Sequence, residues 1–162
     1  MSPVSVYRKC RAKTWSDDGN MSTHSLKPRQ RLAYASHPEY WENHYEDFDD
    51  ADELFKRMDE VFLEYKRKSD APFFVDVSSA DDTWITVGVA DEQWFLMLTR
   101  GPFDVIYSSG DESAEGKIDV WFPSELFLSR RNFVPEKETR AALRKWVGTG
   151  ELPDNIKWTT KC

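Results

Sequence analysis

The residues with the clearest catalytic chemistry are a histidine and a glutamate two positions apart. His37-Pro38-Glu39 matches the H-x-E half of a zinc deaminase signature, in which the histidine binds zinc and the glutamate moves protons. That site also needs a P-C-x-x-C pair, whereas Cys10 and Cys162 lie near opposite ends of the chain. One protein ligand does not hold zinc, so no catalytic metal is expected here.

A second candidate is the acidic segment 39–53, EYWENHYEDFDDADE, in which eight of fifteen residues are Asp or Glu. His44 lies among carboxylates, an arrangement that resembles a metal cluster. The spacing does not match a calcium loop, which needs D-x-[DN]-x-[DN]-G and a closing glutamate. A solvated face that caps a helix is the favoured interpretation, and neither a metal nor a cofactor is expected.

Other catalytic patterns are weak. GTGELP (148–153) follows a predicted helix, whereas a phosphate-binding glycine loop follows a strand. The G-x-S-x-G pattern of a nucleophilic serine is absent, and all three histidines lie within residues 24–44, before most of the predicted strands. Paired carboxylates remain possible, because their separation depends on the tertiary fold. A small carboxylate-dependent hydrolase therefore stays open as an alternative, although no enzyme activity is predicted.

Charge divides the chain. Residues 1–31 carry seven basic and two acidic side chains, a net charge of +5, so the remaining 131 residues carry −12 of the overall −7. We therefore predict a flexible basic arm over 1–37 and one domain over 38–162. An acidic domain repels nucleic acid and lipid phosphates and attracts basic partners. No apolar run is long enough for a membrane helix, and the two distant cysteines suit a reducing cytoplasm.

The pattern of apolar residues predicts the elements of this domain. Residues 40–45 suggest a short strand, and residues 51–66 form an amphipathic helix that Asp49 or Asp50 can cap. Five further strands are expected at 73–78, 84–89, 93–100, 104–109 and 117–122, a second helix at 135–147, and a last strand at 156–158. Short links between strands favour antiparallel pairing. The fold class predicted is α+β: an antiparallel sheet of five to seven strands with two packed amphipathic helices in a single domain.

Acidic and aromatic side chains in the predicted loops and in segment 40–50 are the candidates for partner binding, because large aromatics beside charges commonly anchor protein interfaces. The first group is Tyr40, Trp41, Glu42, His44, Tyr45, Glu46, Asp47, Asp49 and Asp50. The second group lies at strand connections and comprises Asp81, Asp82, Asp91, Glu92, Asp111, Glu112 and Glu115. For each residue alone, a solubilising surface charge is the simpler interpretation.

Three stretches resemble the first-numbered family of bacterial immunity proteins from polymorphic toxin systems. They are TWITVGVADEQWFLML (83–98), IYSSGD (106–111) and VPEKETRAALRKWVGTGELPDNIKW (134–158). In that family a glycine-containing strand leads through a short turn into a second apolar strand. A serine-glycine turn follows, and the chain closes with a helix, a turn with proline and a strand with tryptophan. The likeness covers roughly residues 49–159.

The resemblance implies a cytoplasmic, non-enzymatic antitoxin that binds a cognate toxin domain, mostly as a 1:1 complex. Members of this family often stand beside deaminase-type toxins, which act on nucleic acid. A toxin of that kind presents a basic cleft, which matches an acidic inhibitor. Direct binding to nucleic acid or to a membrane is not expected. The other open alternative is an acidic adaptor protein without a toxin partner.

Overall fold

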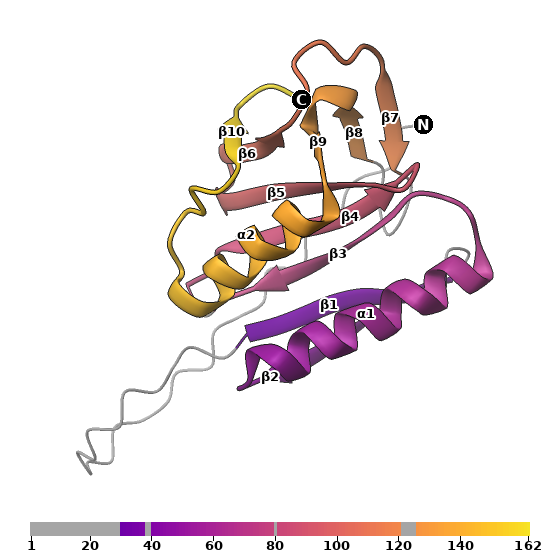
Figure 1. Cartoon of the computed structure of the whole chain (residues 1–162). Coiled ribbons are helices and arrows are strands. Elements are labelled where there is room, and N and C mark those ends of the chain that lie inside the picture. Colours follow the sequence, from indigo (N-terminus) through magenta and orange to yellow (C-terminus); the bar gives the residue numbers. More distant parts are fainter. Residues whose placement is uncertain (1–29, 38–39, 80, 121–125) are drawn as a thin grey trace, which may run out of the picture.

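The computed structural model of the chain describes residues 30–37, 40–79, 81–120 and 126–162 (Figure 1). The helices are α1 (Ala51–Lys68) and α2 (Glu136–Thr149), with a short 3-10 turn, η1 (Arg130–Asn132). The strands are β1 (Gln30–His37), β2 (Tyr40–Phe48), β3 (Phe73–Ser78), β4 (Trp84–Ala90), β5 (Gln93–Gly101), β6 (Asp104–Ser109), β7 (Lys117–Val120), β8 (Leu126–Ser129), β9 (Phe133–Val134) and β10 (Lys157–Thr159).

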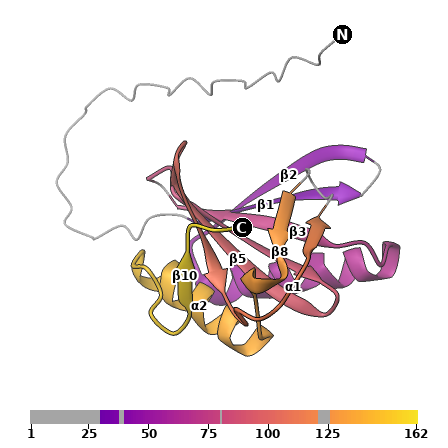
Figure 2. The same cartoon turned by 90° about the horizontal axis from the view of Figure 1, so that it is seen from above.

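Eight of the strands form one antiparallel sheet. Its order is β10-β6-β5-β4-β3-β1-β2, and β9 pairs with the beginning of β5 beside this path. Strands β3 to β6 form a meander, because each short turn can return the chain only as an antiparallel neighbour. The β1–β2 hairpin lies at one edge, where its two strands run side by side in Figure 2.

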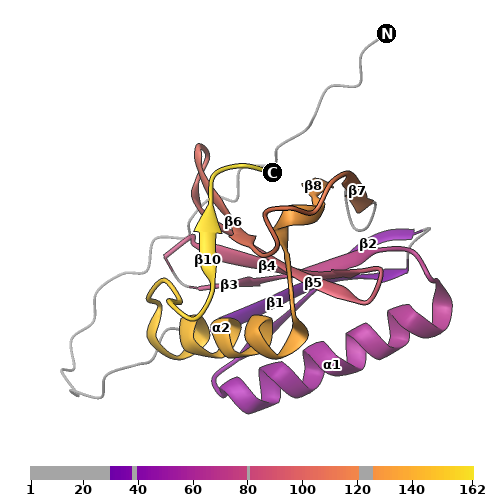
Figure 3. The same ribbon diagram turned by 45° about the horizontal axis from the view of Figure 1, so that its top comes forward.

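Both helices cover the same face of the sheet, and the β7–β8 ribbon lies on the other face (Figure 3). Alternation along the strands separates the two layers, since successive side chains point to opposite faces. On β3, for example, Phe73, Val75 and Val77 belong to the core beneath the helices, whereas Phe74 belongs to the smaller core beneath β7 and β8.

Helix α1 follows directly from its sequence. The carboxylate of Asp50 accepts a hydrogen bond from the backbone N–H of Glu53 at 2.9 Å, which caps the first turn. Acidic residues occupy the first turn and basic residues the last, where each sign favours the helix dipole. The predicted apolar stripe is buried in full: Leu54, Phe55, Met58, Val61, Phe62 and Tyr65.

Helix α2 is fastened to α1 by two arginines. Arg140 reaches the carboxylate of Asp59 and Arg144 that of Asp52, both at 2.7 Å. The Arg144 guanidinium also lies 4.4 Å from the centre of the Phe55 ring, so this side chain makes both an ion pair and a cation–π contact with α1. Gly150 ends the helix in the left-handed conformation, with φ of 72°, and its N–H donates to the carbonyl of Trp146.

The predicted α+β class is confirmed, and the structure adds strands that were not predicted. Strand β1 lies inside the range 1–37 that was predicted to be a basic arm, so the sheet already begins at Gln30. The predicted strand at 117–122 is described as β7 over 117–120, and it pairs with β8 in a separate ribbon instead of joining the main sheet. Strands β8 and β9 were also not predicted.

Candidate functional site

The acidic segment forms an edge strand, β2, whose side chains divide between the two faces of the sheet. The pairing of Leu32 with Glu46 and of Tyr34 with His44 places both β2 residues on the helix-covered face. Tyr45 points to the opposite face and is 62% exposed. For Tyr40, Trp41 and Glu42 the structure gives the backbone of β2, and their side chains lie outside the described part.

Glu46 is bound into a network between β2, β1 and α1. Arg57 of α1 donates from Nε to Glu46 Oε1 at 2.9 Å and from Nη2 to the Tyr34 hydroxyl at 2.6 Å, while that hydroxyl donates to Glu46. Burial alone would raise the pKa of Glu46, but hydrogen bonds from Tyr34 and Arg57 outweigh it and lower the pKa. His44 stacks on the Tyr34 ring, with centroids 5.3 Å apart. Glu46 therefore ties the edge strand to α1, and His44 packs it against Tyr34 of β1.

The remaining acidic residues near the end of β2 lie closer to solvent. Asp47 pairs with Arg31 on the neighbouring strand, with 2.6 Å between Oδ1 and Nε. Asp49 and Asp50 follow the strand and are exposed, and Asp50 caps α1. A capping carboxylate keeps its negative charge, so the cap does not remove Asp50 from an electrostatic surface.

Acidic residues at the turns have mixed roles. Asp81 accepts hydrogen bonds from the Ser79 hydroxyl and the Thr83 backbone N–H, which lowers its pKa. Asp82 has a positive φ of 60° in the same turn. Asp91 and Glu92 form the two-residue β4–β5 turn, with φ of 51° and 62°, a combination typical of type I′ hairpins.

Some acidic residues of the second group, those at the strand connections, also form ion pairs or hydrogen bonds. Asp91 pairs with Arg130 at 3.1 Å. Asp111, after β6, accepts from the backbone N–H and hydroxyl of Ser113, and these bonds lower its pKa. Glu112 and Glu115 are exposed in the same loop. The loop therefore has one carboxylate that shapes it and two that face solvent.

The fold gathers the candidates at the two ends of the sheet. Asp49, Asp50 and Asp81 line a cleft of about 650 Å³ between the start of α1, the β3–β4 turn and the end of α2. We call it the helix-end cleft. Its full lining is Gln30, Phe48, Asp49, Asp50, Ala51, Ser79, Asp81, Trp146, Val147, Gly148, Thr149 and Gly150. Thirty residues of sequence separate Asp50 from Asp81, and the two meet because β1 pairs with both β2 and β3.

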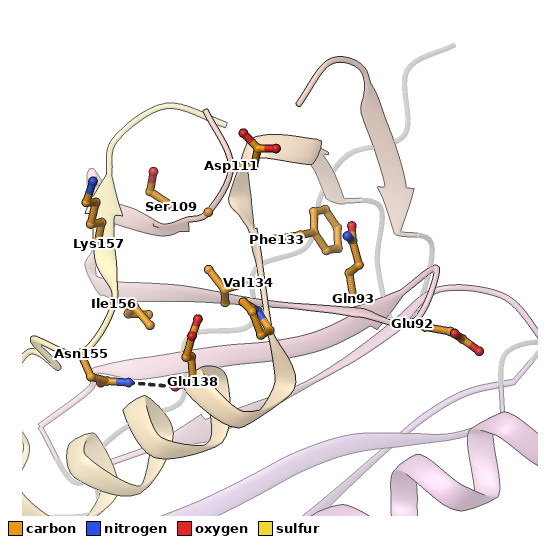
Figure 4. Close-up of a pocket in the computed structure, with 12 residues that line it drawn as sticks. Glu92, Gln93, Ser109, Asp111, Phe133, Val134, Glu138, Asn155, Ile156 and Lys157 are labelled. Atoms are coloured by element: carbon orange, nitrogen blue, oxygen red, sulfur yellow. Dashed lines mark hydrogen bonds between the residues drawn. The ribbon is translucent and has the colours of Figure 1, made fainter. Parts of the chain in front are cut away.

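At the opposite end, Glu92 and Asp111 line a second recess of about 580 Å³, the β10 groove, between β9, β10 and the start of α2 (Figure 4). Glu138 of α2 adds a third carboxylate, and Lys157 of β10 adds a cation. In Figure 4 the Glu92 carboxylate lies apart from those of Asp111 and Glu138, so the three do not converge on one point. The set predicted for partner binding therefore does not form one continuous patch.

Some lining residues of these recesses were not singled out from the sequence. Gln30, Phe48 and the end of α2 line the helix-end cleft, and Glu138 lines the β10 groove. Phe103, in the β5–β6 turn, is 100% exposed, which is unusual for a large apolar side chain. Its position after Gly101-Pro102 was the available signal, because a turn tip cannot bury a side chain easily.

The described residues show neither a metal cluster nor a membrane span. In the part of the chain that the structure describes, no three His, Cys, Asp or Glu side chains gather to hold a metal ion. None of the helices in the described ranges is both long and apolar enough to cross a membrane. Cys162 is a free, exposed thiol.

Comparison with protein-family models gives a match over most of the chain. A family model described as "Imm1: Immunity protein Imm1" matches residues 44–160, from within β2 to the end of β10. The match therefore includes both helices, the meander and most of the lining of both recesses. The search of curated proteins finds no match.

Proposed function

The chain belongs to the Imm1 family of immunity proteins, and on this basis we propose that it neutralises a cognate toxin domain by binding it directly. The family match over residues 44–160 is the observation that carries the proposal. It covers the folded domain almost completely, so the immunity role concerns this fold as a whole. The protein acts as a stoichiometric inhibitor, mostly 1:1, in the cytoplasm of the cell that it protects.

Occlusion is the mechanism that suits this structure best. A rigid sheet covered by two helices holds several charged turns at fixed positions, and such preorganisation limits the entropy lost on binding. A stable complex buries on the order of 1,600 Å² in total, which one end of the sheet with its turns can supply. The catalytic work belongs to the toxin, and this chain blocks access to its substrate.

The charge of the domain supports a basic, nucleic-acid-acting toxin as the target, with a deaminase-type toxin as the specific proposal. Residues 32–162 carry a net charge of −12. A nucleic-acid enzyme presents cationic side chains to phosphates, and an acidic inhibitor competes with the nucleic acid for these side chains. Complementary charge also accelerates association, to roughly 10⁸ M⁻¹s⁻¹ or more at low salt.

Co-expression tests the proposal directly. The proposal predicts a gene for a secreted toxin immediately upstream of this gene. The probe is the C-terminal domain that the upstream gene encodes, expressed from an inducible promoter with and without the full chain. Restored growth together with co-purification of the two proteins is the expected result. Continued killing despite soluble expression of this chain would refute the proposal.

The chemistry of the toxin needs a separate measurement. DNA from cells that express the toxin alone is expected to accumulate base transitions, and the full chain should suppress them. Killing without any change in nucleic-acid sequence would reject the deaminase proposal and leave the immunity role in place.

A further inference from the structure

The end of the sheet that carries the helix-end cleft also carries the most exposed aromatic residue of the described chain. Strand pairing fixes this arrangement: Ser78 pairs with Trp84 across the β3–β4 turn, and Gly101 pairs with Asp104 across the β5–β6 turn. In an antiparallel meander, alternate turns lie at the same end. The Asp81 turn and the Phe103 turn therefore project from one end, and the β4–β5 turn projects from the other.

The lining of the helix-end cleft favours a cation. Among the described residues, its lining contains three aspartates, Asp49, Asp50 and Asp81, and neither Lys nor Arg. The C-terminal end of α2 also faces it, where the helix dipole is negative, and the last turn of that helix contains no basic residue. In Figure 1 the end of α2 and the start of α1 lie on the same side of the molecule, as the shared lining requires.

One lining side chain contains an unused acceptor. The Oε1 atom of Gln30 is buried and, among the described residues, has no hydrogen-bond partner. A buried carbonyl oxygen without a donor destabilises the folded state, so a ligand that donates a hydrogen bond to it gains affinity. Carboxylate and amide carbonyl oxygens accept hydrogen bonds, so they suit a group that only donates them, namely a guanidinium or an ammonium.

The aromatic lining distinguishes between these two cations. Phe48 is half-buried and lines the cleft beside the carboxylates, whereas Trp146, also in the lining, is 3% exposed and leaves Phe48 as the aromatic surface that a ligand can reach. A planar guanidinium stacks on aromatic faces and donates to several acceptors at once, whereas an ammonium is compact and strongly hydrated. The fold already uses this pairing elsewhere, since Arg140 lies 4.8 Å from the centre of the Trp94 ring.

We propose that the toxin docks on this end of the sheet, with one of its arginine side chains in the helix-end cleft and an apolar patch against Phe103. The inference rests on the proposed function, because it names the surface through which that function is exerted. Three strand spacings, roughly 14 Å, separate the β5–β6 turn from β1 in the sheet order β5-β4-β3-β1. Both contacts therefore fit within one interface of ordinary size.

The first test uses isosteric variants in the full chain. Asp49→Asn, Asp50→Asn and Asp81→Asn together remove three negative charges and leave oxygen acceptors for the α1 cap and for the Asp81 turn. The matched control, Glu92→Gln with Asp111→Asn and Glu138→Gln, removes the same charge from the β10 groove.

Affinity for the purified toxin domain is measured by calorimetry at 150 mM salt, with Phe103→Ser as a separate variant. Losses of about tenfold or more are expected for the cleft variant and for Phe103→Ser, and only a small loss for the control. Phe103 is fully exposed, so its replacement should leave the stability of the fold unchanged. Equal losses in the cleft and control variants would overturn the inference, since they would reflect overall charge alone.

The second test needs no toxin and separates failure of this inference from failure of the proposed function. The amide spectrum of the full chain is followed by NMR while N-acetyl-arginine amide is added, and N-acetyl-citrulline amide serves as the neutral isostere. Shifts at Asp81, Gly148 and Gly150 with the arginine compound alone are expected. No response in this region, or an equal response to both compounds, would overturn the cation site even if the chain protects cells.

The chain's own basic residues are the alternative to a toxin arginine as the occupant of the helix-end cleft. Lys27 and Arg29 immediately precede Gln30, which lines the cleft. The double variant Lys27→Gln with Arg29→Gln is titrated in the same way. If the arginine compound binds this variant but not the unaltered chain, the cleft belongs to the chain itself and the inference is wrong. Equal binding by the two proteins supports a partner's arginine.

Discussion

Replacing Asp76 with asparagine should stabilise the protein at neutral pH. Asp76 is half-buried on β3, on the face opposite the helices, where the Thr86 hydroxyl donates to its carboxylate. Burial raises the pKa of Asp76 from 3.8 to about 6, and the hydrogen bond from Thr86 lowers it only in part. The folded protein therefore holds this proton more tightly than the unfolded chain. The associated stability is fully present below pH 3.8 and is lost as the pH rises to about 6.

The magnitude follows from the shift. A difference of about two pKa units corresponds to about 3 kcal/mol. Ionisation of Asp76 above pH 6 therefore lowers the free energy of unfolding by this amount. Asparagine cannot ionise, and its carbonyl oxygen can still accept from Thr86. The variant is therefore expected to gain about 2–3 kcal/mol over the unaltered protein at pH 7.5 and almost nothing at pH 3.5.

Urea unfolding followed by tryptophan fluorescence at both pH values measures this effect. All other titrating groups are common to the two proteins, so the difference between their pH dependences isolates Asp76. Asp119→Asn, which removes one carboxylate from an exposed position of β7, is the matched control for the loss of a negative charge. If Asp76→Asn has the same pH dependence as the unaltered protein, or is less stable at pH 7.5, the account of this buried carboxyl is wrong.

Substitutions at three further positions test the packing, the helix cap and the ion pairs of the fold. Gly88→Ala should destabilise by about 1–3 kcal/mol in urea unfolding, because its Cβ would lie 2.5 Å from the Phe95 ring; a loss within error would contradict this close packing. Asp50→Ala should lower helix stability by about 1 kcal/mol and Asp50→Asn by much less, so equal losses would argue against the cap. Glu46→Gln should cost about 1 kcal/mol by weakening the pair with Arg57, and high salt should reduce that loss; a salt-independent loss would indicate a packing effect instead.

The helices and the meander were predictable because local signals agree there. In α1 the apolar stripe, the cap and the charged ends all specify one helix, and all six stripe residues are buried. Strand β1 was missed because its alternation, with Leu32 and Tyr34 inward, directly follows a basic segment. The sequence does not reveal that β7 pairs with β8, because buried and exposed side chains alternate along Lys117–Val120 as they would in a strand of the main sheet.

The exposure of the candidate acids was predictable from the sequence, but their grouping in space was not. Asp81 and Asp111 were both expected to be reachable at strand connections, and each is exposed in the structure. That they lie in different recesses, at opposite ends of the sheet, follows only from strand order and register. Gln30 and Phe48 carried no chemical signal in the sequence, because their relevance arises from the cleft that they line.

A structural role does not exclude a carboxylate from recognition, and this bears on how the acidic residues of such a domain are interpreted. Asp50 caps α1 through one hydrogen bond and Asp81 closes a turn through two, and in both residues the acceptor is the single oxygen atom Oδ1. Those bonds hold the carboxylates in fixed positions without neutralising them. A fixed charge binds a cation with less loss of side-chain entropy than a mobile one. For this reason we expect the acids that shape the helix-end cleft to be better placed to recognise a partner than Glu112 and Glu115, which are exposed in the loop after β6.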